Sequence, residues 1–436
     1  MQSSKQAHAP LMLPYAQWKS WPERIRHFTP AWHAVIMGTG VVSALLNDFP
    51  YGQSNDNFKL AGCVFFILNL ILFVFICICS FLRYVLNPDV FWLMIGHPAQ
   101  SLYIGCFPMG FATLINSALA LNQNWGFGGS GFLYVLWGFW WLDSALSYLV
   151  CYGMIYTMVV RHEHSISNMA AVWLLPVVTL VVASSTGGLI AQAIKVHSHT
   201  SALVTTAFSF TMLAMGLAFA LMMITIYLLR LLIRGVPDPG LILSAFIVLG
   251  PLGQGGFSLL INGNAISELL PLHIQGDFPQ SALAGQMIYA ACFCASYALW
   301  SMGIAWIVVA VCSIYHVVRV RRTTLHFNMA YWGLVFPNGV FALLTVELSR
   351  VLDSGFFRVV GSLWSALVFL LWGAIFVRSI PPFIDGTLFK APCLPDGSVA
   401  AQLLPTVHTH APHPAPAAAH GEKSDVRDSF ADRNFM

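Results

Sequence analysis

GPLGQGGFSLL, at residues 250–260, places four glycines and a proline in a stretch that is otherwise mostly apolar. Both residue types weaken a helix interior, glycine through its backbone entropy and proline through its missing N–H group. The flanking residues are nonetheless apolar enough to lie in lipid. The segment therefore indicates a membrane helix with an irregular backbone, which a bilayer tolerates only against protein or a water-filled cavity.

The composition of the whole chain places most of it in lipid. Of its 436 residues, 58% are hydrophobic and 8% are charged, and the mean hydropathy is +0.73. An ordinary soluble domain has about 25% charged residues. A chain with so little charge cannot cover a water-facing surface. Its formal net charge of +3 is too small to indicate a nucleic-acid partner.

Ten stretches of about 20 or more apolar residues predict an all-α integral membrane protein with ten transmembrane helices. They cover 30–47, 58–82, 98–121, 132–160, 169–194, 201–233, 240–266, 280–315, 327–350 and 356–379. The expected parts are an N-terminal segment at 1–27, a ten-helix membrane domain at 28–380, and a tail at 381–436. The tail is rich in Pro, Ala and His, and we expect it to be disordered.

The distribution of basic residues predicts that both termini lie in the cytosol. The first 27 residues contain no apolar signal-peptide core. With the N-terminus inside, the cytosolic segments carry most of the Lys and Arg residues, as the positive-inside rule requires. The opposite side then carries only Lys59, Lys195, Arg350 and Arg358.

Gly and Pro interruptions recur in every odd-numbered stretch, about 70 to 85 residues apart, which is the length of one helical hairpin. They are MGTG (37–40), FPMG (107–110), LLP and SSTGG (within 174–188), GPLGQGG (250–256) and FPNG (336–339). We therefore expect five hairpins in a quasi-fivefold ring, with the odd-numbered helices lining a central pore. These helices would be kinked at Gly38, Gly40, Pro108, Gly187, Gly188, Pro251, Gly253 and Pro337. The alternative is that Gly and Pro are simply common in membrane helices.

Five segments carry a resemblance to a known family. They are RHFTPAWHAVIMGTGVVSALL (26–46), HPAQSLYIGCFPMG (97–110), VVASSTGG (181–188), GPLGQGGF (250–257) and FNMAYWGLVFPNGVFAL (327–343). Together they resemble the tellurite-resistance/dicarboxylate transporter family, which includes the plant guard-cell slow anion channel. Within it, the MGTG, FPMG and GPLGQG segments are most similar to the fungal sulfite efflux pumps. His33 departs from the pattern, because an aromatic residue is expected there.

The resemblance implies that 28–380 is an anion transport domain and that the protein is a homotrimer with one pore in each subunit. It also implies a phenylalanine of the ninth helix that closes the pore, for which Phe336 and Phe341 are the candidates. Phe336 is favoured because it precedes Pro337, but roughly 140° of helical rotation separates the two side chains and the choice stays open. The implied function is export of sulfite or hydrogensulfite across the plasma membrane. The alternatives are transport of C4-dicarboxylates such as malate and general conduction of nitrate or chloride.

An anion in the membrane needs positive potential, yet no Lys or Arg lies in the middle of a predicted span. Free backbone N–H groups, helix dipoles and hydroxyl or amide donors can supply it instead. The expected pore-lining donors are Thr39, Ser43, Ser184, Ser185, Gln254 and Asn338. Such a weak site suits a small oxyanion better than a dicarboxylate, for which an arginine clamp would be natural. For each hydroxyl the alternative is a bond to its own helix at i−4.

Two acidic residues lie at membrane depth. Asp143 is near the middle of the fourth predicted helix, where a charge is costly and marks a functional residue by default. Because that helix is even-numbered, a structural hydrogen bond to a neighbouring helix is favoured over a role in proton coupling. Glu347 can pair with Arg350 one turn further on, near the outer face.

Several classes of function are not expected. The cysteines form no metal-binding pair or disulfide framework, and the histidines lie near helix ends, in loops or in the tail rather than at mid-span. This distribution argues against a membrane enzyme with haem or two metal ions. The glycines at 250–256 lack the lysine of a phosphate-binding loop, which argues against ATP hydrolysis. We therefore expect no enzyme activity, cofactor or metal, and as partners only small anions, lipid and further copies of the chain.

Overall fold

The computed structural model describes residues 20–51, 56–273 and 281–394. These residues form helices joined by loops, with no strand among them. Each predicted span corresponds to one long helix: α2 (His33–Asn47), α3 (Asp56–Leu86), α5 (Cys106–Trp125), α6 (Gly129–Val160), α7 (Leu175–Ile194), α8 (His199–Arg234), α9 (Leu249–His273), α10 (Ser281–Tyr315), α11 (Val335–Val351) and α12 (Gly355–Ile384). Two short helices were not predicted, α1 (Trp21–Arg26) and α4 (Pro88–Gly96).

Within the described ranges, nine helices are long and apolar enough to cross a bilayer. The remaining predicted span is α2, which has 15 residues and is preceded by a single 3-10 turn. The fold is therefore that of an all-helical, multi-pass integral membrane protein.

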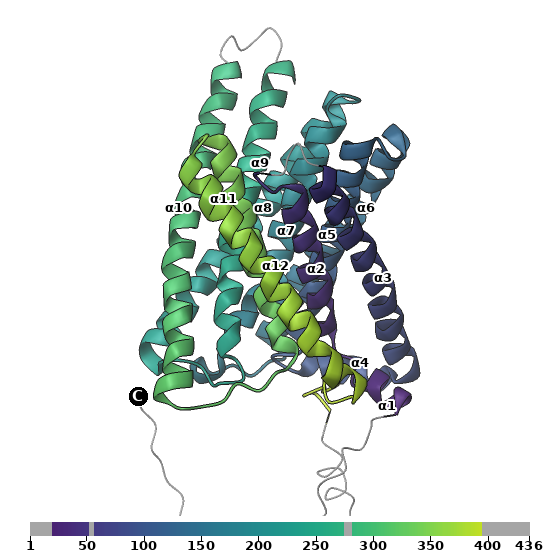
Figure 1. Ribbon diagram of the computed structural model, residues 1–436, viewed down its shortest axis with the longest axis vertical. Coiled ribbons are helices and arrows are strands. Elements are labelled where there is room, and N and C mark those ends of the chain that lie inside the picture. Colours follow the sequence, from purple (N-terminus) through teal and green to yellow (C-terminus); the bar gives the residue numbers. More distant parts are fainter. Residues whose placement is uncertain (1–19, 52–55, 274–280, 395–436) are drawn as a thin grey trace, which may run out of the picture. The chain divides into compact units, whose positions relative to one another are not determined.

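Burial alternates along the chain. In the most apolar stretches of α7 and α9, 94% of the residues are buried, whereas the values for α3 and α10 are 17% and 28%. Helices α2 and α11 are also buried along most of their length. We call α2, α5, α7, α9 and α11 the inner helices, and α3, α6, α8, α10 and α12 the outer helices. Figure 1 shows the outer helices α3 and α10 on opposite sides of the helices between them.

The inner helices pack on one another in chain order, and α11 also packs on α2. Small residues allow the close approach, as is usual between membrane helices. A Cβ atom at Gly253 of α9 would lie 2.7 Å from the backbone nitrogen of Phe341 in α11. Gly253 therefore lets the backbones of α9 and α11 touch, which explains one glycine of the GPLGQGG segment by packing.

The GPLGQGG segment does not interrupt its helix. Helix α9 begins at Leu249 and continues to His273, and the irregular backbone lies just before it in the 3-10 segment η5 (Ile242–Val248). Pro251 is thus in the first turn of α9, where its missing N–H group costs no intrahelical hydrogen bond. The irregularity expected within the helix is found at the start of the helix.

The same junction begins every inner helix. A 3-10 segment immediately precedes each of the other four: η1 (Pro30–Trp32), η2 (Ser101–Gly105), η4 (Ala171–Leu174) and η7 (Met329–Leu334). Prolines in the first turn of three of these helices match Pro251: Pro108, Pro176 and Pro337. The five 3-10 segments contact one another in the same cyclic order as the helices. All inner helices therefore begin at one end of the bundle, the lower end in Figure 1, where α1 and α4 also lie.

The glycines predicted as kinks inside the inner helices are packing positions. Gly38 faces α11, where a Cβ atom would lie 3.2 Å from that of Val335, and a Cβ atom at Gly188 would lie 2.9 Å from Ile261 in α9. Gly187 leaves room for the ring of Trp140 on α6. These glycines lie within continuous α-helices and bring neighbouring helices close together.

The packed structure continues beyond residue 380, where we expected the tail to begin. Helix α12 continues through Pro381 and Pro382 to Ile384. Arg24 of α1 donates hydrogen bonds to the carbonyl oxygens at the end of this helix, at 3.1 Å from Phe383 and 2.9 Å from Ile384. Residues up to 394 are therefore part of the packed structure, whereas 1–19 and the rest of the predicted tail, 395–436, lie outside the described residues.

Candidate functional site

Two cavities lie between the inner helices, one towards each end of the bundle. The lower cavity, of about 50 Å³, is bounded by residues of the 3-10 segments η2, η5 and η7 and by residues near the starts of the inner helices, and its lining includes Met37, Met109, Val178, Leu243 and Ile247. The upper cavity, of about 170 Å³, is lined by residues of all five inner helices, including Gly40, Thr113, Val182, Gln254 and Val340.

Among the residues that the structure describes, Phe336 is the one that lines both cavities. It is the second residue of α11, and only 4% of its surface is exposed. Phe336 is therefore buried at a position that borders both the lower cavity and the upper cavity.

Phe341, the other candidate for a pore-closing residue, lines neither cavity. Its ring stacks on Trp300 of α10, with 6.3 Å between the centroids, and contacts the edge of Trp364 of α12 at 5.8 Å. Phe341 therefore points outward from the inner helices and packs against two outer helices.

The two linings differ in chemistry. The lower cavity is almost entirely apolar, with Tyr103 and Ser244 as its side chains that carry hydroxyl groups. The upper cavity carries hydroxyl and amide side chains: Asn47, Thr113, Asn116, Ser117, Gln123, Asn124 and Gln254. Among the described residues of both linings there is no Lys, Arg or His, and the only acidic residue is Asp48.

Gln254, from the GPLGQGG segment, is the predicted amide donor that lines a cavity. It is buried in the upper cavity wall, and its side-chain nitrogen donates to the hydroxyl oxygen of Ser185 on α7. Ser185 in turn donates to the carbonyl oxygen of Val182 at 2.8 Å. Ser185 thus orients Gln254 without itself lining either cavity, and one amide hydrogen of Gln254 is left for another acceptor.

Comparison with known proteins identifies the family of this chain. Residues 27–380 match the family model described as voltage-dependent anion channel (SLAC1). The chain belongs to this family. The resemblance expected from the sequence motifs is thereby confirmed, and the family consists of channels and transporters rather than enzymes.

Curated relatives extend over most of the chain. The sulfite efflux pump SSU1 of Trichophyton rubrum is 34% identical over 367 residues, which cover 84% of this chain and 93% of the relative. The sulfite efflux pump SSU1 of Candida albicans is 28% identical over 366 residues, covering 78% and 71%. The malic acid transport protein of Schizosaccharomyces pombe is 22% identical over 368 residues, covering 84% and 81%.

In this anion channel family member, two predicted donors of α2 face outer helices. The Thr39 hydroxyl donates to the carbonyl oxygen of Val35 at 2.8 Å and accepts from the Trp372 indole of α12 at 3.1 Å. The Ser43 hydroxyl donates to the carbonyl oxygen of Gly62 on α3 at 2.8 Å. Both hydroxyls therefore form hydrogen bonds that join α2 to the outer helices α12 and α3. Neither residue lines the lower or the upper cavity.

Ser184 and Asn338 also lie outside both linings. The hydroxyl oxygens of Ser184 and Ser258 are 2.8 Å apart, and their hydrogen bond joins α7 to α9. The Asn338 amide donates to the carbonyl oxygen of Leu334 at 2.8 Å, four residues earlier in the chain. The Asn338 amide is thus occupied by the preceding turn of the chain.

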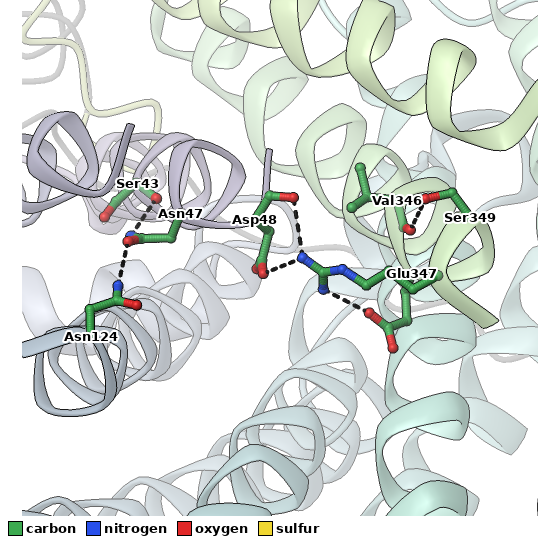
Figure 2. Close-up of polar contacts among 8 residues, drawn as sticks. Ser43, Asn47, Asp48, Asn124, Val346, Glu347 and Ser349 are labelled. Atoms are coloured by element: carbon green, nitrogen blue, oxygen red, sulfur yellow. Dashed lines mark hydrogen bonds and ion pairs between the residues drawn. The ribbon is translucent and has the colours of Figure 1, made fainter. Parts of the chain in front are cut away.

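The polar face of α5 was missed in the sequence. Thr113, Asn116, Ser117 and Asn124 all line the upper cavity. Their spacing places them along one side of an α-helix, and this periodicity was the signal that could have identified them. Asn124 donates to the side-chain oxygen of Asn47 at 3.1 Å, which links the ends of α5 and α2 (Figure 2).

An ion-pair cluster lies at the upper end of the inner helices. Arg350 of α11 contacts the Asp48 carboxylate at 2.8 Å and the Glu347 carboxylate at 3.0 Å. Figure 2 labels Asp48 and Glu347 and marks these ion pairs with dashed lines. The predicted pair between Glu347 and Arg350 is therefore confirmed, and Asp48 extends it to α2. A second pair, between Lys195 and Glu268, joins α7 to α9.

Asp143 is fully buried on α6 and lines neither cavity. Neither of its carboxylate oxygens has a hydrogen-bond partner among the described residues, so the expected bond to a neighbouring helix is not found. A charged form would be costly in this position, because neither a counter-charge nor a donor compensates for the lost water.

Basic residues at the lower end are engaged outside the cavities. Arg83 is fully buried and donates to the carbonyl oxygen of Arg26 at 3.2 Å, and the Arg161 guanidinium lies over the Trp92 ring. Burial lowers the pKa of His97, and the charge of nearby His162 acts in the same direction.

In the part of the chain that the structure describes, no cluster of His, Cys, Asp or Glu could hold a metal ion.

Proposed function

We propose that this protein exports sulfite or hydrogensulfite from the cytosol across the plasma membrane. The match to the voltage-dependent anion channel family supports anion transport, and the relatives named sulfite efflux pumps support the substrate. The observation that supports the transport mechanism is the position of Phe336, which lines both cavities between the inner helices.

The proposed pathway runs along the axis of a ring formed by the five inner helices. Their packing in cyclic order supports such a ring. The lower cavity would open towards the cytosol, and the Phe336 ring would block passage as an apolar constriction. Beyond it, Gln254 and the polar face of α5 would offer neutral donors to the anion. This arrangement gives a weak, distributed site that releases an ion as readily as it binds it.

The orientation and assembly complete the proposal. Most basic residues flank the lower end, so the positive-inside rule places that end and both termini in the cytosol. Exposed apolar side chains of the outer helices would contact lipid and, in a homotrimer, the neighbouring subunits. Each subunit would keep its own pathway.

The alternative substrate is a C4-dicarboxylate, since one relative is named a malic acid transport protein. That relative is 22% identical to this chain, against 34% for a sulfite efflux pump. Within the described part of the chain, neither cavity lining contains the arginine that would bind a carboxylate through two hydrogen bonds. Sulfite is therefore the substrate that we propose.

The test is rescue of cells that lack their own sulfite exporter. Expression of this chain should restore growth on sulfite and lower the intracellular sulfite concentration. A variant with Val340→Trp, which fills the upper cavity beside Phe336, serves as the control and should express without rescue. Malate uptake without sulfite rescue would move the assignment to dicarboxylates, and the absence of flux for sulfite, malate, nitrate and chloride would refute transport.

A further inference from the structure

The path through the two cavities offers no fixed positive charge to an anion. Among the described residues, neither lining contains a Lys, Arg or His, whereas the Asp48 carboxylate lines the upper cavity. Two basic groups at that end, Arg350 and Lys195, are held in ion pairs with carboxylates and are not part of either lining. The charge of a passing anion must therefore be stabilised by neutral groups.

A pathway lined by neutral groups discriminates strongly between singly and doubly charged anions. The cost of moving an ion from water into a medium of low dielectric rises with the square of its charge, so a dianion costs roughly four times as much as a monoanion of the same size. The apolar lower cavity and the Phe336 ring add little compensation. The amide donors of the upper cavity compensate in part, but the Asp48 carboxylate repels a dianion more than a monoanion.

We propose, building on the proposed function, that the pathway passes singly charged oxyanions and rejects doubly charged ones. The exported species is then hydrogensulfite, HSO₃⁻, and not the sulfite dianion. The two forms interconvert near neutral pH by gain or loss of one proton in the cytosol. Each exported hydrogensulfite thus removes one proton equivalent and one negative charge, without a proton-transferring side chain. This agrees with the position of Asp143, which lines neither cavity.

The test uses the full-length protein in liposomes, with radiolabelled sulfite flux and current measured together. The charge moved per sulfur should be one at two pH values on either side of neutrality. At constant total sulfite, the flux should fall on the alkaline side in proportion to the hydrogensulfite fraction. Methanesulfonate is the control probe, because it is a monoanion of similar shape that does not titrate in this range. Its flux should stay constant with pH, whereas sulfate should pass at least about tenfold more slowly.

A pair of variants at one position tests the physical cause. Gln254→Lys places a positive charge in the upper cavity and should raise the flux of sulfate relative to methanesulfonate. Gln254→Met, which has similar length and no charge, should keep the rejection of sulfate. Equal ratios in the two variants would show that the missing cation is not the cause.

The outcomes separate this inference from the proposed function. Two charges per sulfur, or sulfate flux equal to that of methanesulfonate, would overturn the selectivity for single charge while leaving sulfite export intact. Methanesulfonate flux with neither sulfate nor sulfite flux would overturn sulfite export and retain the charge rule. The absence of any anion flux would refute both.

Discussion

The lower and upper cavities meet at Phe336 but differ in size and chemistry. The lower cavity, of about 50 Å³, is bounded mainly by apolar side chains, whereas the upper one, of about 170 Å³, is bounded in large part by amides and hydroxyls. An anion in the upper cavity can keep part of its water and gain hydrogen bonds. In the lower cavity it must give up water with little compensation. If the protein transports anions as we propose, the barrier should therefore be concentrated at the lower cavity and the Phe336 ring.

This difference arises because different parts of the chain line the two cavities. The lower cavity is built from 3-10 segments and first helical turns, for example by Leu243 and Ile247 of η5. The upper cavity is built from the regular α-helical parts, where α5 turns its polar face inward. Substitutions at Phe336, in the upper cavity and at its rim should therefore have effects of decreasing size.

The largest effect is expected from Phe336→Ala. Removal of the ring joins the two cavities and should raise the anion conductance by about tenfold or more, because a barrier lower by 1.4 kcal/mol already gives a factor of ten. Conductance is measured by voltage clamp in oocytes that express equal amounts of each variant at the surface.

Phe341→Ala is the matched control, since it removes the same ring from the same helix. Phe341 packs against Trp300 and Trp364, so its loss should lower thermal stability, by about 3 kcal/mol or more in unfolding free energy. Its basal conductance should stay low. A conductance increase with Phe341→Ala and none with Phe336→Ala would show that Phe341, and not Phe336, blocks the pathway.

A smaller effect is expected from Gln254→Leu. This change removes the amide from the upper cavity at nearly constant volume and should lower the conductance by about threefold to tenfold, which corresponds to about 0.7 to 1.4 kcal/mol and lies within the range of a typical net hydrogen bond. Gln192→Leu is the control, because the Gln192 amide joins α7 to the carbonyl oxygen of Ile261 at 3.1 Å but lines neither cavity. Equal losses in the two variants would mean that Gln254 acts only through helix packing.

The sequence predicted the helices and their alternation well, because both depend on long stretches of composition. The predicted span 132–160, for example, corresponds to α6 at Gly129–Val160. The recurring Gly and Pro residues lie on or just before five helices that are buried along most of their length, whereas their arrangement as a fivefold ring around a pore stays a prediction. Their backbone role was different from the prediction, because Pro251 is compatible with the first turn of a helix that follows a 3-10 segment.

The directions of individual side chains could not be predicted from the sequence. In a soluble helix the polar face marks the solvent, but α2 is apolar on nearly all sides, so Thr39 and Ser43 gave no indication of the axis. Their hydroxyls bind groups of α12 and α3, which come from distant parts of the chain. Gln254 was predicted to face the cavity and does line it, in agreement with the preference of a long amide for a polar space.

The smallest effect is expected at the upper rim, from Arg350→Met. The change leaves the Asp48 carboxylate unpaired where it lines the upper cavity, so it should repel anions and lower the conductance by about twofold to threefold. The side chains of Arg350 and Asp48 are 35% and 38% exposed, so salt should weaken the effect.

The double variant Arg350→Met, Asp48→Asn isolates the charge, since it removes the cation and the carboxylate together. Its conductance should return close to that of the unmodified protein. Arg358→Met breaks a comparable pair with Asp353 that lies outside both linings and should leave conductance unchanged. If Arg350→Met changes neither the conductance nor its salt dependence, anions do not pass the Asp48 side of the upper cavity. The exit would then have to be sought on the side where Lys195 pairs with Glu268.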